Sequence, residues 1–210
     1  LTYIVQDAPN GLREVYINTE SFLDRHPSAM ILEENIFYGD GLTDVLALAA
    51  ARDEGGMLFG YRVSDPKRCG VFDNQEHVIS LVEKPKQLAS QFAIIRNYFL
   101  DATASGQAKL IAPSERGEIE IASLLRQYLG ASSLTVKKFT RGHTWLHTCT
   151  HRIVLDAGNF VRKLHRRQGL LMRSLDKIAF ARSWISKNPL LAHEDCFSQI
   201  AYGRQYSSTA

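Results

Sequence analysis

The chain has 210 residues, which suits one compact domain with an appended helical piece. Its formal net charge of +3, with 22% charged and 45% hydrophobic residues, is compatible with phosphate-bearing substrates but falls short of the basic patch of a nucleic-acid-binding protein. No apolar stretch approaches the ~20 residues of a membrane span and no signal peptide opens the chain, so we expect a cytoplasmic protein that binds neither nucleic acid nor membrane.

Short apolar runs typical of strands alternate with segments of helical spacing along the first 149 residues. Strands are expected at residues 1–6, 28–32, 57–63, 70–73, 77–83, 93–100, 134–139 and 144–146, and helices at 11–24, 42–53 and 118–129. This alternation predicts an α/β fold with a mostly parallel, Rossmann-like sheet flanked by helices. In such sheets, ligands bind beyond the carboxyl ends of the strands.

The last part of the chain has a different pattern. A basic segment with an apolar stripe predicts a helix over residues 150–168, and further helices are expected at 175–185 and 193–202. We therefore divide the chain into a core at residues 1–149 and a C-terminal helical region at residues 150–210.

The stretch I-L-E-E-N-I-F-Y-G at residues 31–39 places two carboxylates where the predicted strand at 28–32 ends. One interpretation is an acid presented to a divalent cation that bridges phosphate oxygens, because such cations prefer oxygen ligands. The other is an edge strand with two solvated glutamates, since exposed Glu is common. The stretch alone leaves both interpretations open.

Two further stretches are each ambiguous. V-Q-D-A-P-N-G-L at residues 5–12 lets the backbone approach a flat ligand, with Gln6 available to read a base edge, and it equally fits an ordinary turn. S-L-V-E-K-P at residues 80–85 offers Lys84 for a phosphate and Glu83 for a sugar hydroxyl, and it equally fits a surface ion pair.

Histidines gather in R-G-H-T-W-L-H-T-C-T-H at residues 141–151, where His147 and His151 stand four residues apart. A zinc site is one interpretation, but no glutamate lies between these two histidines as it does in a metalloprotease helix. The three cysteines of the chain are far apart and form no C-x-x-C pair, so neither a disulfide framework nor a zinc knuckle is indicated.

In their order and spacing, these stretches resemble the glucose-1-phosphate thymidylyltransferase family of sugar nucleotidyltransferases. That family shows V-Q followed by P-x-G-L-A, then L-G-D-N-I-F-Y-G, D-P-x-x-Y-G-V, S-x-x-E-K-P, P-S-x-R-G-E-x-E-I and R-G-x-x-W-x-D-T-G-T. The chain has counterparts to all six, including D-P-K-R-C-G-V at residues 65–71 and P-S-E-R-G-E-I-E-I at residues 113–121. The resemblance covers nearly the whole chain and implies the nucleotidyltransferase fold.

The resemblance also implies a reaction. Members of the family condense a nucleoside triphosphate, usually dTTP, with glucose 1-phosphate, and they release pyrophosphate. The sugar-phosphate oxygen attacks the α-phosphorus in line, so catalysis depends on positioning and charge neutralisation. A homo-oligomer, specifically a homotetramer with a regulatory nucleotide site between subunits, is implied for the C-terminal helices.

The resemblance assigns roles to residues at matching motif positions. The implied contacts are Gln6 and Gly11 for thymine, Gly70 and Glu83 for the glucosyl unit, Lys84 and Arg116 for its phosphate and for catalysis, Ile94 and Tyr98 for the sugar pocket, and Glu34 and His147 for Mg²⁺, with Asn35 beside Glu34 as a further substrate contact.

Departures from the family pattern cluster at the implied chemistry. The two metal-binding aspartates of the family are replaced by Glu34 and His147. Neutral imidazole is a poor ligand for Mg²⁺, so a softer ion such as Mn²⁺ is an alternative. The Thr-Gly ahead of the sugar strand is replaced by Ile95-Arg96, which adds bulk and charge near the sugar.

The glycine-rich loop G-G-x-G-T-R-L, which cradles the triphosphate in the family, has no counterpart in the sequence. We expect either the C-terminal portion of a longer chain or a decayed homologue, and the residues leave both open. The alternative function is therefore a catalytically impaired or inactive homologue or fragment that binds a nucleotide-sugar or a partner subunit.

Overall fold

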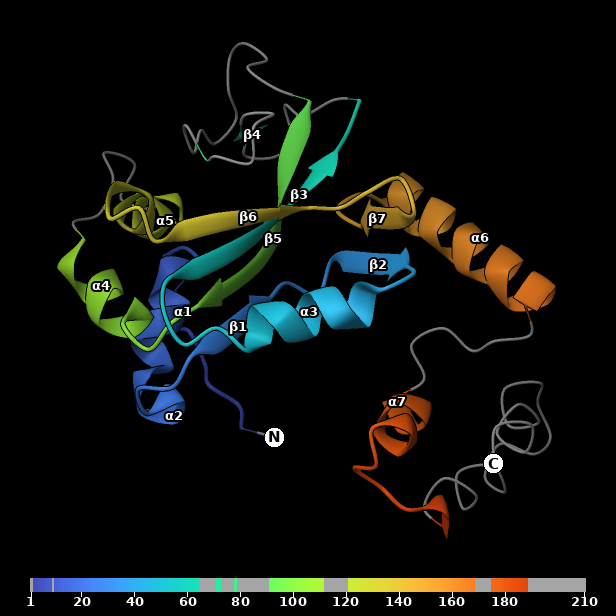
Figure 1. Ribbon diagram of the computed structural model, residues 1–210, viewed down its shortest axis with the longest axis horizontal. Helices are drawn as coiled ribbons and strands as arrows, with labels where there is room; N and C mark the ends of the chain where they lie inside the picture. The colour runs from blue at the N-terminus through green and yellow to red at the C-terminus, as the bar shows by residue number, and fades with distance from the viewer. Residues whose placement is uncertain are drawn as a thin grey trace. The chain divides into compact units, whose positions relative to one another are not determined.

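The structure, a computed structural model, describes residues 2–8, 10–64, 71–72, 78, 91–111, 121–168 and 175–188 (Figure 1). The chain divides into two compact units, Leu1–His147 and Thr148–Ala210. The first unit holds the strands, and the second holds the helices α6 (His151–Gln168) and α7 (Leu175–Ala181). No helix within the described residues is long and apolar enough to cross a membrane.

The described strands of the main sheet follow the order β1-β5-β3-β6, with β4 paired to β5. They are β1 (Ser28–Ile31), β3 (Gly56–Arg62), β4 (Val71–Phe72), β5 (Phe92–Leu100) and β6 (Leu134–Lys138). β1 and β3 each pair with β5 antiparallel, whereas β3 pairs with β6 parallel. The strands β1, β3 and β6 therefore run in one direction. The strand β5 lies between β1 and β3 and runs in the opposite direction.

The predicted α/β class is confirmed, but the sheet formed by the described strands is mixed rather than mostly parallel. Helical crossovers return the chain to the same end of a sheet, which explains why β1, β3 and β6 run the same way. The strand β5 alone accounts for every antiparallel pairing of the described main sheet, because its neighbours β1, β3 and β4 all run against it.

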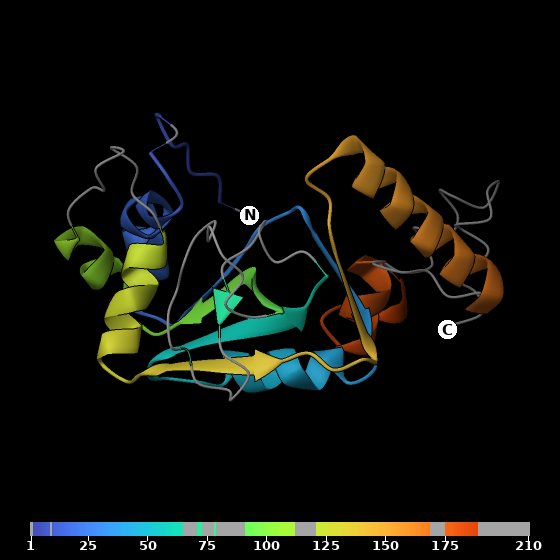
Figure 2. The same cartoon turned by 90° about the horizontal axis from the view of Figure 1, so that it is seen from above.

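Helices cover both faces of this sheet. They are α1 (Arg13–Asn18), α2 (Glu20–Leu23), α3 (Leu42–Ala50), α4 (Ala104–Leu110) and α5 (Ile121–Gly130). Side chains of a strand alternate between its faces, so Leu58 and Ile94 join a core with α1, α4 and α5, whereas Phe59 and Ile95 join a second core with α3. Figure 2 shows α3 on the opposite side of the sheet from α1.

A second, two-stranded sheet pairs β2 (Asn35–Gly39) with β7 (His143–His147) antiparallel. Aromatic rings attach this sheet to the main one. The ring of Phe139 stacks on Phe59 at a centroid distance of 5.2 Å and on His143 at 4.8 Å. The small sheet is therefore packed onto the core rather than held by its own two strands, which would be marginal alone.

Most predicted elements are confirmed within the described residues. The strand predicted at residues 1–6 is wrong, because residues 2–6 have no strand structure. The helix predicted at 11–24 is divided at Thr19, whose Oγ1 donates to the Val15 carbonyl at 2.6 Å. Helix α4 was missed, because A-S-G-Q-A-K-L has weak apolar spacing. The elements predicted at 77–83 and 193–202 lie almost wholly outside the described residues.

Gly55 occupies a tight position before β3. Its φ of +75° lies in the left-handed region that favours glycine, and an added Cβ would lie 2.3 Å from the Ser133 carbonyl oxygen. Its N–H donates to Asp101 Oδ2 at 2.6 Å, and its carbonyl accepts from the Asp101 N–H at 3.0 Å. The turn is therefore fastened to the end of β5 by two hydrogen bonds.

We expect Gly55→Ala to destabilise the protein by about 2 kcal/mol or more, because it adds backbone strain and a clash with backbone. The matched control is Gly106→Ala in α4, where an added Cβ meets nothing within 4 Å. That change should be neutral or stabilising by about 0.5–1 kcal/mol. Chemical denaturation followed by circular dichroism checks both, and equal effects of the two variants would contradict the account.

Candidate active site

The E-E-N stretch forms the turn that joins the main sheet to the small one. β1 ends at Ile31 and β2 begins at Asn35, whose N–H donates to the Leu32 carbonyl at 3.3 Å. Glu33 is exposed on this turn, whereas Glu34 is half-buried. The two glutamates thus differ: the solvated interpretation fits Glu33, and Glu34 is the acid held within the structure.

Glu34 lies between two basic side chains. Its Oε1 accepts from His147 Nε2 at 2.7 Å and from Arg96 Nη1 at 3.3 Å. The side chains of Glu34, His147 and Arg96 are 27%, 18% and 37% exposed, so water still reaches all three. Ion pairs this accessible contribute on the order of 0–1 kcal/mol to stability each, and their main effect is to hold the geometry.

This donor set does not fit Mg²⁺. The two predicted ligands, Glu34 and His147, are bonded to each other, and only one of them offers oxygen. The Arg96 cation shares the same carboxylate oxygen. A unit positive charge at roughly 5 Å from a divalent ion costs about 2 kcal/mol even in bulk water. Within the described residues, no three or more His, Cys, Asp or Glu side chains gather as a metal site.

Asn35 is 3% exposed, and its carboxamide is bonded inside the protein. Its Nδ2 donates to the Leu32 carbonyl at 3.0 Å, and its Oδ1 accepts from Trp145 Nε1 at 2.8 Å. Asn35 stands opposite His147 in the β2/β7 register. This buried hydrogen bond therefore fixes the pairing that brings Glu34 and His147 together, although the two residues are 113 positions apart.

The structure brings the predicted thymine-binding residues together in one loop. Gln6 Nε2 donates to the Gly11 carbonyl at 3.4 Å and to the Glu14 carboxylate, and Asn10 Nδ2 donates to Glu14 Oε1 at 3.0 Å. Hydrogen bonds from Asn10 and Gln6 hold the pKa of Glu14 below its ordinary value. Gly11 has a φ of +103°, so its place in the loop requires glycine.

The predicted sugar-pocket residues, Ile94 and Tyr98, lie on β5 with 6% and 4% exposure, inside the core that α1 and α5 cover. The structure thus places both in the hydrophobic core, and their contact with a sugar stays a prediction. The predicted residues Gly70, Glu83, Lys84 and Arg116 lie outside the described residues.

Sequence reasoning missed the partnership of Arg96 with Glu34. The sequence marked Arg96 as an added charge near the sugar but gave no partner, because the two residues are 62 positions apart. It also missed the hydrogen bond of Trp145 to Asn35. The signal that could have found the first is the joint replacement of both implied metal ligands together with the gain of an arginine.

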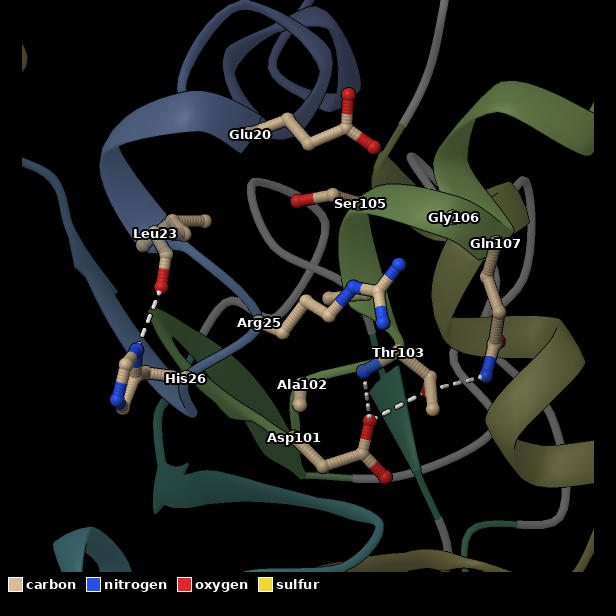
Figure 3. Close-up of a pocket in the computed structure, with 11 residues that line it drawn as sticks. Glu20, Leu23, Arg25, His26, Asp101, Ala102, Thr103, Ser105, Gly106 and Gln107 are labelled. Carbon is tan, nitrogen blue, oxygen red and sulfur yellow. Dashed lines mark hydrogen bonds between the residues drawn. The ribbon is translucent and has the colours of Figure 1, made fainter.

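A cavity of ≈540 Å³ opens at the other end of the sheet (Figure 3). Leu100 stands opposite Ser28, the first residue of β1, so Asp101 lies at the end where β1 begins, whereas Glu34 follows its last residue. Figure 3 shows the Arg25 and Ser105 side chains pointing into this space. None of the predicted site residues lines it, and its residues are Glu20, Leu23, Arg25, His26 and 101–107.

Asp101 is the most strongly bonded acid of this cavity. Its Oδ1 accepts from the Thr103 N–H at 2.9 Å and from the Tyr128 hydroxyl at 2.9 Å, and its Oδ2 accepts from the Gly55 N–H. Burial alone would raise the pKa of Asp101, but the hydrogen bonds from Thr103, Gly55 and Tyr128 outweigh it and lower the pKa. The carboxylate therefore stabilises the connection between β5 and α4.

We expect Trp145→Phe to destabilise the protein by about 1–3 kcal/mol, because it removes the indole donor of a buried hydrogen bond to the Asn35 oxygen. The matched control is Trp184→Phe, since Trp184 is 75% exposed and should change stability by less than about 0.5 kcal/mol. Chemical denaturation checks both variants. Equal stability of the two variants would show that the Asn35–Trp145 bond does not fix the small sheet.

Asp101→Asn should lower stability by about 1–2 kcal/mol at pH 7, because the charged acceptor is lost. The folded-state pKa of Asp101 lies below its unfolded value, so its contribution is present above the unfolded pKa of about 3.9 and is lost as pH falls through the folded pKa. Melting curves at pH 7, 5, 4 and 3 should therefore show a difference between wild type and variant that persists down to about pH 4 and shrinks at pH 3. A difference that grows on acidification would contradict this assignment.

Comparison with known proteins shows which sequences the chain is similar to. The model of a family described as "Nucleotidyl transferase" matches residues 1–163. The chain is 42% identical over 192 residues to the glucose-1-phosphate thymidylyltransferase of Xanthomonas campestris pv. campestris (strain B100), covering 90% of this chain and 65% of that protein. It is 39% identical over 206 residues to the enzyme of the same name from Neisseria gonorrhoeae, covering 97% of this chain and 72% of that protein. The chain thus spans less than two thirds of the first relative.

Solved structures agree with this fold. A Bacillus anthracis protein described as a glucose-1-phosphate thymidylyltransferase, in complex with a sucrose, has a TM-score of 0.68 and 30% identity over 77% of this chain and 65% of that chain. A UDP-glucose pyrophosphorylase complexed with UDP-glucose has a TM-score of 0.66 at 19% identity, over 77% of this chain and 66% of that chain, and shows the fold alone. From its sequence matches, the chain belongs to the nucleotidyl transferase family.

Proposed function

We propose that the protein is a glucose-1-phosphate thymidylyltransferase, which transfers the thymidylyl group of dTTP to glucose 1-phosphate and yields dTDP-glucose and pyrophosphate. The observation that carries the proposal is the 42% identity over 192 residues to a protein of that name. The geometry of the first unit supports it, because Gln6 meets Gly11 in one loop and Glu34 meets His147 at the end of β1.

The proposed reaction is an in-line displacement at phosphorus. A phosphate oxygen of glucose 1-phosphate forms a bond to the α-phosphorus of dTTP. The bond between the α-phosphorus and the oxygen that bridges it to the β-phosphorus breaks, and pyrophosphate leaves with that electron pair. Negative charge gathers around the reacting phosphorus, so Lys84 and Arg116 are proposed to neutralise it. No step of this proposal uses a metal held by Glu34 and His147, because their donor set does not fit Mg²⁺.

Substrate positioning falls to the remaining predicted residues. Gln6 and Gly11 bind the thymine, Gly70 and Glu83 bind the glucosyl unit, and Ile94 and Tyr98 form the wall of the sugar pocket. Asn35 acts through structure in this proposal, because its carboxamide holds β2 against β7 beneath the site. It is therefore proposed to position Glu34, and its own contact with substrate stays a prediction.

The proposal extends to the setting of the reaction. Both substrates are anionic metabolites of the cell interior, so the protein is proposed to work in the cytoplasm. Apolar residues remain exposed on α6, including Val154 and Leu155 at 51% and 69% exposure. Association of the second unit with further copies of the chain, giving a homo-oligomer, would cover such side chains.

Pyrophosphate release from dTTP and glucose 1-phosphate tests the proposal, with dTDP-glucose identified by mass spectrometry. We expect release that requires both substrates. Lys84→Ala and Arg116→Ala should each lower kcat/KM by about 100-fold or more, because a charge that stabilises the transition state is lost. The matched control is Lys109→Ala, which removes an exposed ion pair with Glu20 in α2 and should leave kcat/KM unchanged.

A different outcome would identify the competing function. If the protein releases no pyrophosphate while dTTP or dTDP-glucose raises its melting temperature, it binds the nucleotide without transferring it, because a ligand stabilises only a state that it binds. If neither ligand raises the melting temperature and no pyrophosphate appears, both functions are wrong for this protein.

A further inference from the structure

We propose that Arg96 is the resident cation of the Glu34 site and that it excludes a divalent metal from the position where the resemblance places one. The inference concerns the site of the proposed function and depends on that function only for its role in catalysis. The metal affinity of Glu34, His147 and Arg96 can be measured without nucleotide or sugar.

The register of β5 explains how Arg96 reaches Glu34. β5 pairs with β1 up to Asn97, which stands opposite Ile31, the last residue of β1. Arg96, which precedes Asn97 in β5, therefore lies just beyond the end of β1, beside the turn that carries Glu34. This placement requires no rearrangement of either strand.

The pairing of β5 with β3, on its other side, is irregular around the same residue. Met57 pairs with Phe99 and Phe59 pairs with Ile95, so two steps along β3 oppose four steps along β5. Arg96 lies within this irregular segment, where bulged strands bend and re-aim side chains. Its two neighbours in sequence, Ile95 and Asn97, are buried at 0% and 2% exposure, whereas its own side chain is 37% exposed.

The chemistry of the three side chains favours a permanent cation over a metal ion. Guanidinium keeps its charge at all ordinary pH values, so Arg96 supplies a fixed positive charge to Glu34 Oε1. His147 Nε2 bonds the same oxygen at 2.7 Å, so the imidazole nitrogen that faces Glu34 is already engaged. A divalent ion would have to displace both bonds and then lie beside a like charge.

Manganese binding to the full chain without nucleotide tests the proposal, since Mn²⁺ is followed directly by electron paramagnetic resonance. We expect Arg96→Gln to bind Mn²⁺ about tenfold or more tightly than the wild type, because it removes the charge and keeps a polar side chain. Arg96→Lys should stay as weak as the wild type, because it restores the charge. The double variant Arg96→Gln, Glu34→Gln should lose the gain.

The matched control is Arg62→Gln on β3, which removes one positive charge from a side chain that donates to Gln91. It should leave Mn²⁺ affinity unchanged. If Arg96→Gln does not fold by circular dichroism, Arg96→Met provides the uncharged side chain instead.

Two results would overturn the proposal. One is tight Mn²⁺ binding by the wild type that Glu34→Gln abolishes, which would make Glu34 a working metal ligand in the presence of Arg96. The other is an unchanged Mn²⁺ affinity in the uncharged Arg96 variants. Because the measurement uses no nucleotide or sugar, a failure of pyrophosphate release would leave its outcome intact and would count only against the proposed function.

Discussion

The pairing of β2 with β7 is the constraint on which the candidate site depends. A two-stranded sheet has only marginal stability by itself, so its register needs a buried interaction to hold it. The hydrogen bond from Trp145 to Asn35 supplies it, and the stacked rings of Phe139 and His143 tie the pair to the main sheet. Without that pairing, Glu34 and His147 would have no reason to meet, since they are 113 positions apart in the sequence.

The direction of β5 determines what surrounds this pairing. Because β5 runs against β1, residues near its middle pass the carboxyl end of β1 and its last residues pass the opposite end. Arg96 therefore belongs to the Glu34 site, and Asp101, five positions later, belongs to the turn at Gly55. β5 thus supplies a basic group to one end of the sheet, and the residue that follows it supplies an acidic anchor to the other.

The sequence predicts the α/β class and most strands and helices, because buried runs such as 57–63 and the helix at 42–53 have clear periodicity. It overestimates the parallel character of the sheet. The direction of a strand depends on which strands it pairs with, and the spacing of apolar residues carries no information about that. Motif order indicates the family, which sequence comparison confirms. The joint replacement of both implied metal ligands and the gain of Arg96 are the sequence's signal for the Arg96–Glu34 contact, but its geometry depends on a register that only the folded sheet defines.

The close approach of β2 and β7 at Gly39 limits how the length of the two-stranded sheet can change among relatives. An added Cβ at Gly39 would lie 2.7 Å from the His143 ring, so the strands approach closely at the end farthest from Glu34. A single-residue insertion inside either strand would turn every following side chain to the opposite face. Evolutionary length changes should therefore be confined to the connections outside residues 35–39 and 143–147, and aligned relatives should show these two segments without gaps.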